Sequence, residues 1–308
     1  MTRFFVPFLA VLVTALAVSA AKPASSEAVI VGIGDQNPQT FQDQNFRSLG
    51  VKRTRVFTPW NSIFTEPERL DTWIQAARRA GAEPLIAFWK ARGDKCPARP
   101  CTLPSVKAYT RAFKAFRKKY PGIRLYQPWN ETNSNTEPTG KKPKRAAEYY
   151  NAMRKSCRRC KVVALDLLDG KNMKKYVSTF KKFVKGKEPT LWGLHNYSDT
   201  NRSRTKGTKL LLKLVKGEIW LTETGGLTSF TAADGRQILP ASEARATRAT
   251  SFLLNKLVRI DKRRIKRVYL YQWRKTNAND RFDAGIVRFD GTPRPIFNLL
   301  RTKRSLFR

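Results

Sequence analysis

Eight short apolar segments alternate along this chain with segments of helical spacing. Each apolar segment has the length of a buried strand and is nearly continuous in hydrophobic residues, which is typical of parallel sheets covered by helices. The predicted strands are residues 28–36, 52–60, 83–89, 123–131, 161–168, 190–197, 218–226 and 267–273. This alternation predicts an α/β fold with a parallel sheet.

The segments between the strands carry helix start and stop signals. Residues 66–81 begin with Glu-Pro and end with Gly, and residues 105–122 repeat apolar residues at intervals of three and four before Pro-Gly. The same logic predicts helices in residues 145–156, 172–186, 208–217, 242–260 and 295–307. Eight strands without a long linker predict one (β/α)8 TIM barrel over residues 28–308, because closure leaves no strand edge unpaired.

An open, doubly wound sheet is the competing architecture. Such folds commonly place G-x-G-x-x-G after the first strand, whereas residues 32–37 read GIGDQN and lack the last glycine. The chain also lacks a G-x-S-x-G sequence, which disfavours a serine hydrolase that would use His195 as its base. We therefore expect a barrel without a nucleotide or other organic cofactor.

The N-terminus has the pattern of a secretory signal peptide. Arg3 precedes an apolar run over residues 4–18, and the small residues at 18–20 suit signal peptidase. We expect a signal peptide at residues 1–20, a polar spacer at 21–27 and a secreted, extracellular protein. A membrane anchor is the alternative, but the apolar run is short for a span of about 20 residues.

The four cysteines occur as two close pairs, in CPARPC (96–101) and CRRC (157–160). Two local disulfides are the simplest pairing for an oxidising compartment. A zinc site is disfavoured because the chain has one histidine, and we expect no metal site.

Lys and Arg number 61 against 23 Asp and Glu, for a formal net charge of +38. Much of this excess falls in predicted helices, which would form the outer wall of a barrel, so a solvated positive surface is expected. The functional hypothesis is electrostatic retention on an anionic cell envelope or acidic polysaccharide, which salt would reverse. No nucleic-acid-binding motif is present, so we expect no specific nucleic acid partner, and we expect a monomer.

In a TIM barrel the chemistry lies where strands end and loops begin. In this chain those positions hold mainly aromatic residues and carboxylates. They are Asp35, Trp60, Trp89, Asn130, Glu131, Asp166, Asp169, His195, Tyr197, Glu223 and Trp273. Sugar rings pack their C–H faces on aromatic rings and need polar partners for their hydroxyls, so this composition favours a poly- or oligosaccharide substrate.

Glu131 and Glu223 are the predicted catalytic pair. Hydrolysis of a glycosidic bond needs one carboxyl to protonate the leaving oxygen and one carboxylate to attack or stabilise the anomeric carbon. The two residues follow the fourth and seventh strands, so they can meet across the barrel mouth. We assign the proton to Glu131 and the charge to Glu223, with Arg55 of the second strand keeping Glu223 ionised. A separation of about 5 to 5.5 Å would indicate retention, and about 6.5 to 9.5 Å inversion.

Two motifs resemble those of the clan A retaining glycoside hydrolases. WNETN (129–133) is similar to their Asn-Glu signature on strand four, and WLTETGG (220–226) to their strand-seven nucleophile. The resemblance implies a retaining O-glycosyl hydrolase that uses Glu131 as acid and base and Glu223 as nucleophile. The clan usually has Pro after the acid, whereas Thr132 follows here.

The resemblance also implies roles for four other side chains. Asn130 would contact the sugar 2-hydroxyl, Tyr197 would orient the nucleophile, Arg55 would lie beside it, and Trp273 would form the floor under the cleaved sugar.

Several candidates keep two interpretations. Trp60 and Trp89 stack on sugar or cap the core, and His195 contacts substrate or bonds a backbone carbonyl. Asp166 and Asp169 are subsite residues or, as we favour, loop caps. For the whole chain, the alternative to an enzyme is a catalytically inactive carbohydrate-binding barrel retained on an anionic envelope.

Overall fold

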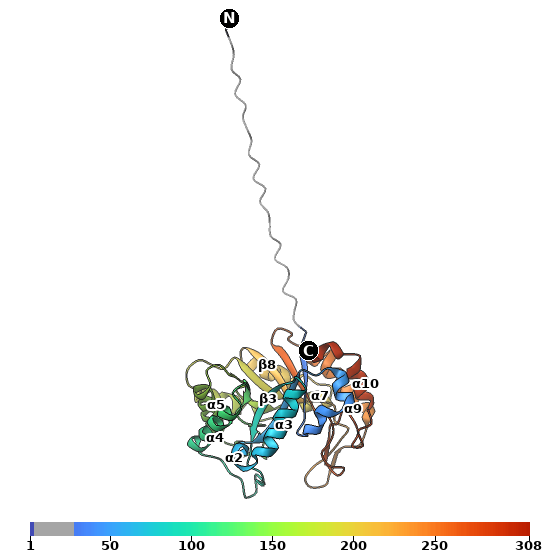
Figure 1. The fold of residues 1–308 in the computed structure, drawn as a ribbon, viewed down its shortest axis with the longest axis horizontal. Helices are drawn as coiled ribbons and strands as arrows, with labels where there is room; N and C mark the ends of the chain where they lie inside the picture. Colours follow the sequence, from blue (N-terminus) through green and yellow to red (C-terminus); the bar gives the residue numbers. More distant parts are fainter. Residues whose placement is uncertain (3–27) are drawn as a thin grey trace.

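A computed structural model describes residues 1–2 and 28–308 of the chain (Figure 1). The predicted signal peptide and polar spacer fall almost wholly on residues 3–27 and lie outside the described residues. Within the described part, no helix has the length and apolar character needed to cross a membrane.

All eight predicted strands are present in one parallel sheet, and the fifth is split in two. The strands are β1 (Ile30–Gly34), β2 (Arg53–Pro59), β3 (Glu83–Trp89), β4 (Leu125–Gln127), β5 (Lys161–Val162), β6 (Asp166–Leu168), β7 (Leu191–His195), β8 (Glu218–Thr224) and β11 (Ile265–Tyr271). Their order in the sheet is β5-β4-β3-β2-β1-β11-β8-β7-β6. β5 and β6 lie at the two ends of this order although they are successive parts of one segment.

That segment closes the barrel. β5 pairs with β4, and β6 pairs with β7. Between them, the Val163 N–H donates to the Tyr126 carbonyl at 2.9 Å, and the Ala164 N–H donates to the Leu191 carbonyl at 2.9 Å. The residues from 161 to 168 therefore bond to both neighbours, and the predicted eightfold barrel is confirmed.

Helices surround the barrel, and each of the seven predicted helices is present. They are α1 (Gln44–Leu49), α2 (Ser62–Thr65), α3 (Pro67–Arg79), α4 (Val106–Lys119), α5 (Pro143–Ser156), α6 (Met173–Lys182), α7 (Tyr197–Asn201), α8 (Lys206–Leu214), α9 (Glu243–Asn255) and α10 (Pro295–Arg301), with 3-10 turns η1 (Pro38–Gln42), η2 (Leu257–Arg259) and η3 (Arg304–Phe307). Proline opens α3, α5 and α10, and the Ser105 hydroxyl caps α4 by accepting the Ala108 N–H at 3.1 Å.

Two hydrophobic clusters form the core. The larger one includes the inward faces of the helices and the strand side chains that meet them. The smaller one consists of five buried side chains, each from a different strand segment, that fill the interior of the barrel. Its buried members are Leu85, Leu125, Val163, Trp220 and Tyr269.

Two disulfides and a small antiparallel sheet stabilise the loops of the barrel. Both predicted disulfides form, Cys96–Cys101 after β3 and Cys157–Cys160 before β5. A small antiparallel sheet, absent from the sequence prediction, joins the loops after β8 and β11. Its strands are β9 (Ser229–Thr231), β10 (Gln237–Leu239) and β12 (Phe282–Asp283).

Candidate active site

Arg55 is the centre of a buried polar cluster at the barrel mouth. The side chain extends from β2, is 1% exposed, and donates from Nη1 to Glu223 Oε2 at 2.7 Å. Nη2 donates to Asp166 Oδ2 at 2.7 Å and Asn130 Oδ1 at 2.6 Å, and Nε donates to Gln127 Oε1 at 2.7 Å. Burial opposes the charge, but the Asp166 and Glu223 carboxylates raise the pKa of Arg55 and keep it cationic.

Asp166 and His195 form a second ion pair beneath the mouth. Asp166 is fully buried on β6, accepts from His195 Nε2 at 3.0 Å, and also accepts the Thr222 hydroxyl. Burial acts to raise the pKa of Asp166, but the positive His195 and Arg55 lower it. A β-carbon on Gly193 would lie 2.8 Å from the Thr222 hydroxyl oxygen and 2.9 Å from the Asp166 carboxylate. Glycine therefore leaves room for the hydrogen bond between Thr222 and Asp166.

His195 is a buried cation in this arrangement. Burial alone would lower its pKa, but Asp166 and Glu223 raise the pKa to about 10. The ring is therefore protonated at neutral pH, and Nδ1 lies 3.2 Å from Glu131 Oε1. Because the ring is 0% exposed, His195 is placed to hold other side chains and not to touch substrate. Its ring nitrogens face the Glu131 and Asp166 carboxylates and not a backbone carbonyl, and Nε2 also lies 3.4 Å from Arg55 Nη2.

Glu131 occupies the turn after β4 with a backbone φ of 46°, a left-handed conformation that non-glycine residues seldom adopt outside functional sites. Its side chain is 25% exposed. The next residue, Thr132, donates from both N–H and Oγ1 to the Asp166 carbonyl, at 2.8 and 3.1 Å. Proline has no N–H, so this contact is a physical reason for threonine where the clan usually has proline.

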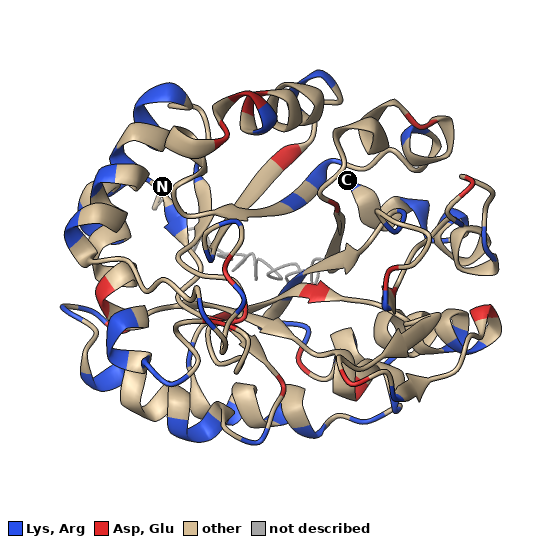
Figure 2. Cartoon of the chain, turned by 90° about the horizontal axis from the view of Figure 1, so that it is seen from below, with Lys and Arg blue, Asp and Glu red and all other residues tan. Residues whose placement is uncertain are grey.

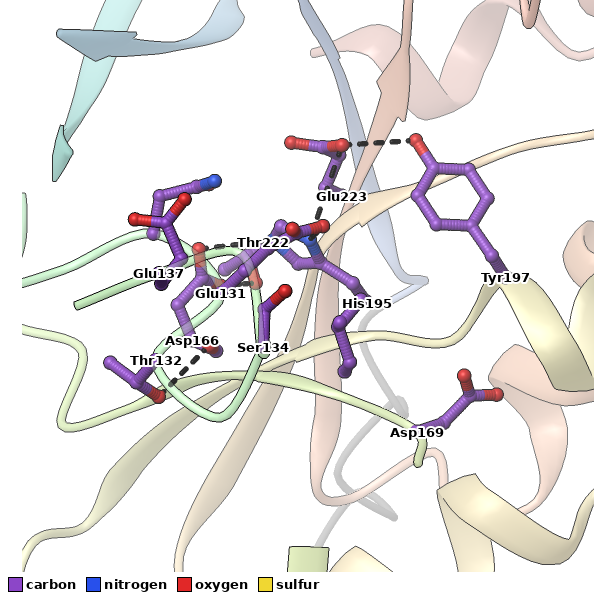
Figure 3. Close-up of polar contacts among 12 residues, drawn as sticks. Glu131, Thr132, Ser134, Glu137, Asp166, Asp169, His195, Tyr197, Thr222 and Glu223 are labelled. Atoms are coloured by element: carbon purple, nitrogen blue, oxygen red, sulfur yellow. Dashed lines mark hydrogen bonds and ion pairs between the residues drawn. The ribbon is translucent and has the colours of Figure 1, made fainter. Parts of the chain in front are cut away.

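Glu223 faces Glu131 across the mouth. Each residue offers a carboxylate oxygen, and these oxygens lie within 4.8 Å of each other. The Tyr197 hydroxyl donates to Glu223 Oε1 at 3.1 Å, so the two oxygens of Glu223 are held by Tyr197 and Arg55 (Figure 3). Glu223 is 6% exposed. The structure thus brings together Arg55, Asn130, Glu131, Tyr197 and Glu223, as their strand positions predict.

Five half-buried aromatic rings form a continuous series that ends at Tyr197, beside Glu223. Successive ring centroids are 5.2 Å apart from Trp89 to Phe57, 6.2 Å from Phe57 to Tyr271, 6.2 Å from Tyr271 to Phe282 and 5.3 Å from Phe282 to Tyr197. We call these five residues the aromatic arc. Three of them, Phe57, Tyr271 and Phe282, line a cavity of about 720 Å³. Phe57 and Tyr271 lie within the predicted second and eighth strands, but no pattern in the sequence singled them out.

Trp273 corrects one prediction. It is 1% exposed, its ring centroid lies 5.3 Å from that of Phe46 and 6.1 Å from that of Phe297, and its indole N–H donates to Asp43 at 2.9 Å. The chain leaves the strand after Tyr271, so Trp273 points into the core near α1 and α10. It does not form a substrate floor.

The remaining predicted site residues differ in their distance from the catalytic pair and in the contacts that they make. Trp89 is in the aromatic arc and donates to Glu137 at 2.8 Å, whereas Trp60 is half-buried and packs against the core. Asp169 lies apart from the carboxylate pair and accepts the first N–H groups of α7 (Figure 3). Asp35 is buried and holds the loop after β11 by accepting the Trp273 N–H at 2.9 Å. Asp169 is thus a cap, whereas Asp166 is neither a loop cap nor a subsite residue, because it is a fully buried partner of Arg55 and His195.

Glu137 is a functional candidate that the sequence did not reveal. It is 5% exposed and accepts both the Trp89 and Trp129 indole N–H groups, at 2.8 and 2.9 Å. Burial raises its pKa to about 7, although Lys90 and the indoles act to lower it. Glu137 therefore fixes the orientation of Trp89 at one end of the aromatic arc.

Glu131, His195 and Glu223 also have the spacing of a metal-binding triad. The charges in the cluster do not fit that use. The Arg55 guanidinium lies against the cluster, with Nη2 3.4 Å from His195 Nε2, so a metal cation among these three residues would meet a fixed positive charge. The Arg55 guanidinium already neutralises Glu223 at 2.7 Å. The cluster is therefore better suited to hydrogen bonding and proton transfer than to holding a cation.

Comparison with known proteins places the fold among sugar-cleaving enzymes. No protein-family model and no curated protein matches the chain. Among solved structures, a family 39 glycoside hydrolase from Bacteroides cellulosilyticus WH2 has a TM-score of 0.58 at 17% identity, covering 91% of this chain and 64% of that one. The β-D-glucuronidase of Dictyoglomus thermophilum has a TM-score of 0.60 at 12% identity, covering 90% and 50%.

The exo-β-1,4-mannosidase Op5Man5 of Opitutaceae bacterium strain TAV5 has a TM-score of 0.61 at 15% identity, covering 95% of this chain and 62% of that one. This chain therefore spans about half to two thirds of the length of these three proteins. At these identities the likeness concerns the fold. The chain shares the barrel fold of these enzymes, as its alternation of strands and helices predicts.

Proposed function

We propose that the protein is a secreted glycoside hydrolase that cleaves a poly- or oligosaccharide with retention of anomeric configuration. The observation that carries this proposal is the approach of Glu131 and Glu223 to within 4.8 Å at the barrel mouth. That distance fits the retaining geometry of about 5 to 5.5 Å better than the inverting one of about 6.5 to 9.5 Å.

In the first step, a Glu223 oxygen forms a bond to the anomeric carbon while the glycosidic C–O bond breaks. The proton of Glu131 passes to the leaving oxygen. In the second step, Glu131 takes a proton from water, the water oxygen attacks the anomeric carbon, and the bond to Glu223 breaks. No metal or organic cofactor enters either step.

The surrounding side chains support these roles by charge. Arg55 pairs with one oxygen of Glu223 at 2.7 Å, and the Tyr197 hydroxyl donates to the other at 3.1 Å, so both oxygens are held in place. The His195 cation, 3.2 Å from Glu131 Oε1, stabilises the carboxylate that remains when Glu131 has given up its proton. Asn130, whose Oδ1 is held by Arg55, is assigned the sugar 2-hydroxyl.

The test is a panel of plant, fungal and bacterial polysaccharides with detection of new reducing ends. Glu223→Gln should lower turnover by at least about 10³-fold without unfolding the protein. Glu131→Gln should retain activity on substrates with good leaving groups, because these need no protonation. Normal rates in Glu223→Gln would refute the assignment of the nucleophile.

The alternative is a barrel that binds glycan without cleaving it. Binding accompanies both functions, so only product formation separates them. Two carboxylates at hydrolytic distance favour the enzyme.

Secretion and surface retention complete the proposal. The two disulfides are typical of proteins from oxidising compartments, in agreement with the signal-like N-terminus. Helices α4, α6 and α8 contain no acidic residue and α5 contains only Glu148, and Figure 2 shows Lys and Arg spread over the outer ring of helices. Exposed positive charges on this surface would retain the protein on an anionic cell envelope, and moderate salt should release it because salt screens such charges. Retention that survives high salt would contradict it.

A further inference from the structure

The cavity beside the aromatic arc has a positively charged border. Its volume is about 720 Å³, and Phe57, Tyr271 and Phe282 line it together with the amides of Gln36 and Asn37. Aromatic faces with nearby amide groups are a suitable lining for a sugar ring. Two arginines complete the border, Arg69 from α3 and Arg281 from the loop before β12.

This cavity adjoins the proposed catalytic pair. The ring of Phe282 packs edge-on against Tyr197, whose hydroxyl bonds Glu223. Tyr271, which is also in the lining, is close enough to Glu223 for that carboxylate to raise its pKa, although burial is the main cause. A sugar in the cavity would therefore lie next to the bond that Glu223 attacks.

Arg69 and Arg281 differ from other arginines near the mouth. Arg92 pairs with Glu66 at 2.7 Å, and Arg294 pairs with Asp283 at 2.7 Å. Within residues 28–308, neither a hydrogen bond nor an ion pair joins the Arg69 or Arg281 side chain to another residue. Both side chains are exposed at the cavity edge.

A second, smaller cavity continues the first toward Trp89. It shares Gln36, Pro38, Phe57 and Arg69 with the larger cavity. The acidic residue in the lining of the larger cavity is Asp280, and its carboxylate accepts the Asn277 N–H at 2.8 Å within its own loop. The two guanidinium groups therefore leave the cavity positively charged.

We propose that the sugar bound in this cavity carries a carboxylate, so that the substrate is a uronic-acid-containing glycan whose carboxylate is held by Arg69 and Arg281. The planar guanidinium fork fits a carboxylate with two parallel hydrogen bonds. This inference rests on the proposed glycoside hydrolase function and narrows its substrate class. It also gives a specific role to two of the many positive charges, most of which lie on the outer helices.

The test compares acidic polysaccharides with their carboxyl-reduced forms. Reduction converts each carboxylate to a hydroxymethyl group and leaves the linkages unchanged. The wild-type protein should prefer the acidic polymer. Arg69→Gln and Arg281→Gln should each lower kcat/KM on it by roughly fivefold, as for a charge-assisted pair at a partly exposed site, and should leave the reduced polymer unaffected.

Arg263→Gln is the matched control, because this exposed arginine lies in the turn before β11 at the opposite end of the barrel. It makes the same change in net charge and should leave both rates unchanged. Equal cleavage of acidic and reduced polymers by the wild type, or equal losses on both in the arginine variants, would overturn the inference while leaving the hydrolase intact. Preference for a sulfated over a carboxylated polymer would overturn the carboxylate assignment.

A binding measurement separates this inference from the proposed function. If no polymer is cleaved, the hydrolase proposal fails, and calorimetric titration with acidic and carboxyl-reduced oligosaccharides decides the inference alone. Tighter binding of the acidic oligosaccharide, lost in the double Arg69→Gln, Arg281→Gln variant, would support it. Equal affinity for the two would refute it.

Discussion

Replacement of Asp166 by asparagine should destabilise the fold strongly, although the two side chains have nearly the same shape. Asp166 is fully buried and pairs with Arg55 at 2.7 Å and His195 at 3.0 Å. The substitution removes one of the two carboxylates that pair with Arg55 and the carboxylate nearest to His195, so both buried cations lose compensating charge. Loss of one partner from a buried ion pair costs about 3 to 5 kcal/mol of unfolding free energy. At 2 to 4 °C per kcal/mol, the melting temperature should fall by roughly 6 to 20 °C.

The pH dependence provides a second readout of the same pair. The folded-state pKa of His195 is raised from 6.5 to about 10, so its contribution to stability is fully present below pH 6.5 and is lost as the pH rises toward 10. The pKa of Asp166 is lowered from 3.8, so its contribution is present above pH 3.8 and is lost only in stronger acid. The difference in unfolding free energy between wild type and Asp166→Asn should therefore be largest between pH 3.8 and pH 6.5 and should decrease toward pH 10.

Differential scanning calorimetry from pH 5 to 10 would check both effects. Asp234→Asn is the matched control, because its carboxylate is 62% exposed and pairs loosely with Arg236 at 3.7 Å. It should leave the melting temperature unchanged. A decrease of less than about 2 °C in Asp166→Asn, or a gap that is constant from pH 6 to 10, would refute the argument that these charges depend on one another.

Two further substitutions test the site more locally. Tyr197→Phe removes the 3.1 Å hydrogen bond to Glu223 and should lower kcat by roughly tenfold or more with an unchanged melting temperature, and unchanged steady-state rates would contradict its orienting role. Tyr271→Ala should raise KM several-fold through loss of one ring of the aromatic arc, whereas Trp273→Ala should cost about 3 to 5 kcal/mol of stability as a core truncation. Urea unfolding and steady-state kinetics of both variants measure the two effects. A Trp273→Ala protein with unchanged stability and a raised KM would show that Trp273 forms part of the substrate floor.

The barrel was predictable because its signals are local. Each strand is a nearly continuous apolar run, and helix-terminal prolines and glycines bound the segments between them. The interruption of the fifth strand between Val162 and Asp166 was not predicted, because it depends on which neighbour each residue bonds. The small sheet of β9, β10 and β12 was also missed, since its strands are two or three residues long and come from two loops.

The candidate site was predictable where strand order alone determines position. Glu131 and Glu223 are carried to one mouth by the topology, whatever the loops do. The contact between Asp166 and His195 requires the register of two neighbouring strands, which the sequence does not give. Trp273 was misplaced because periodicity ends with the strand, and the chain turns away after Tyr271.

The stereochemistry of the first product tests the pairing of Glu131 with Glu223 most directly. Proton NMR can follow the anomeric signal of the sugar released from a substrate identified in the polysaccharide panel. Two carboxylates within 4.8 Å are closer together than the inverting separation of about 6.5 to 9.5 Å and predict a first product with the same anomeric configuration as the substrate. A first product of the opposite configuration would show that water attacks directly and that Glu223 is not the nucleophile.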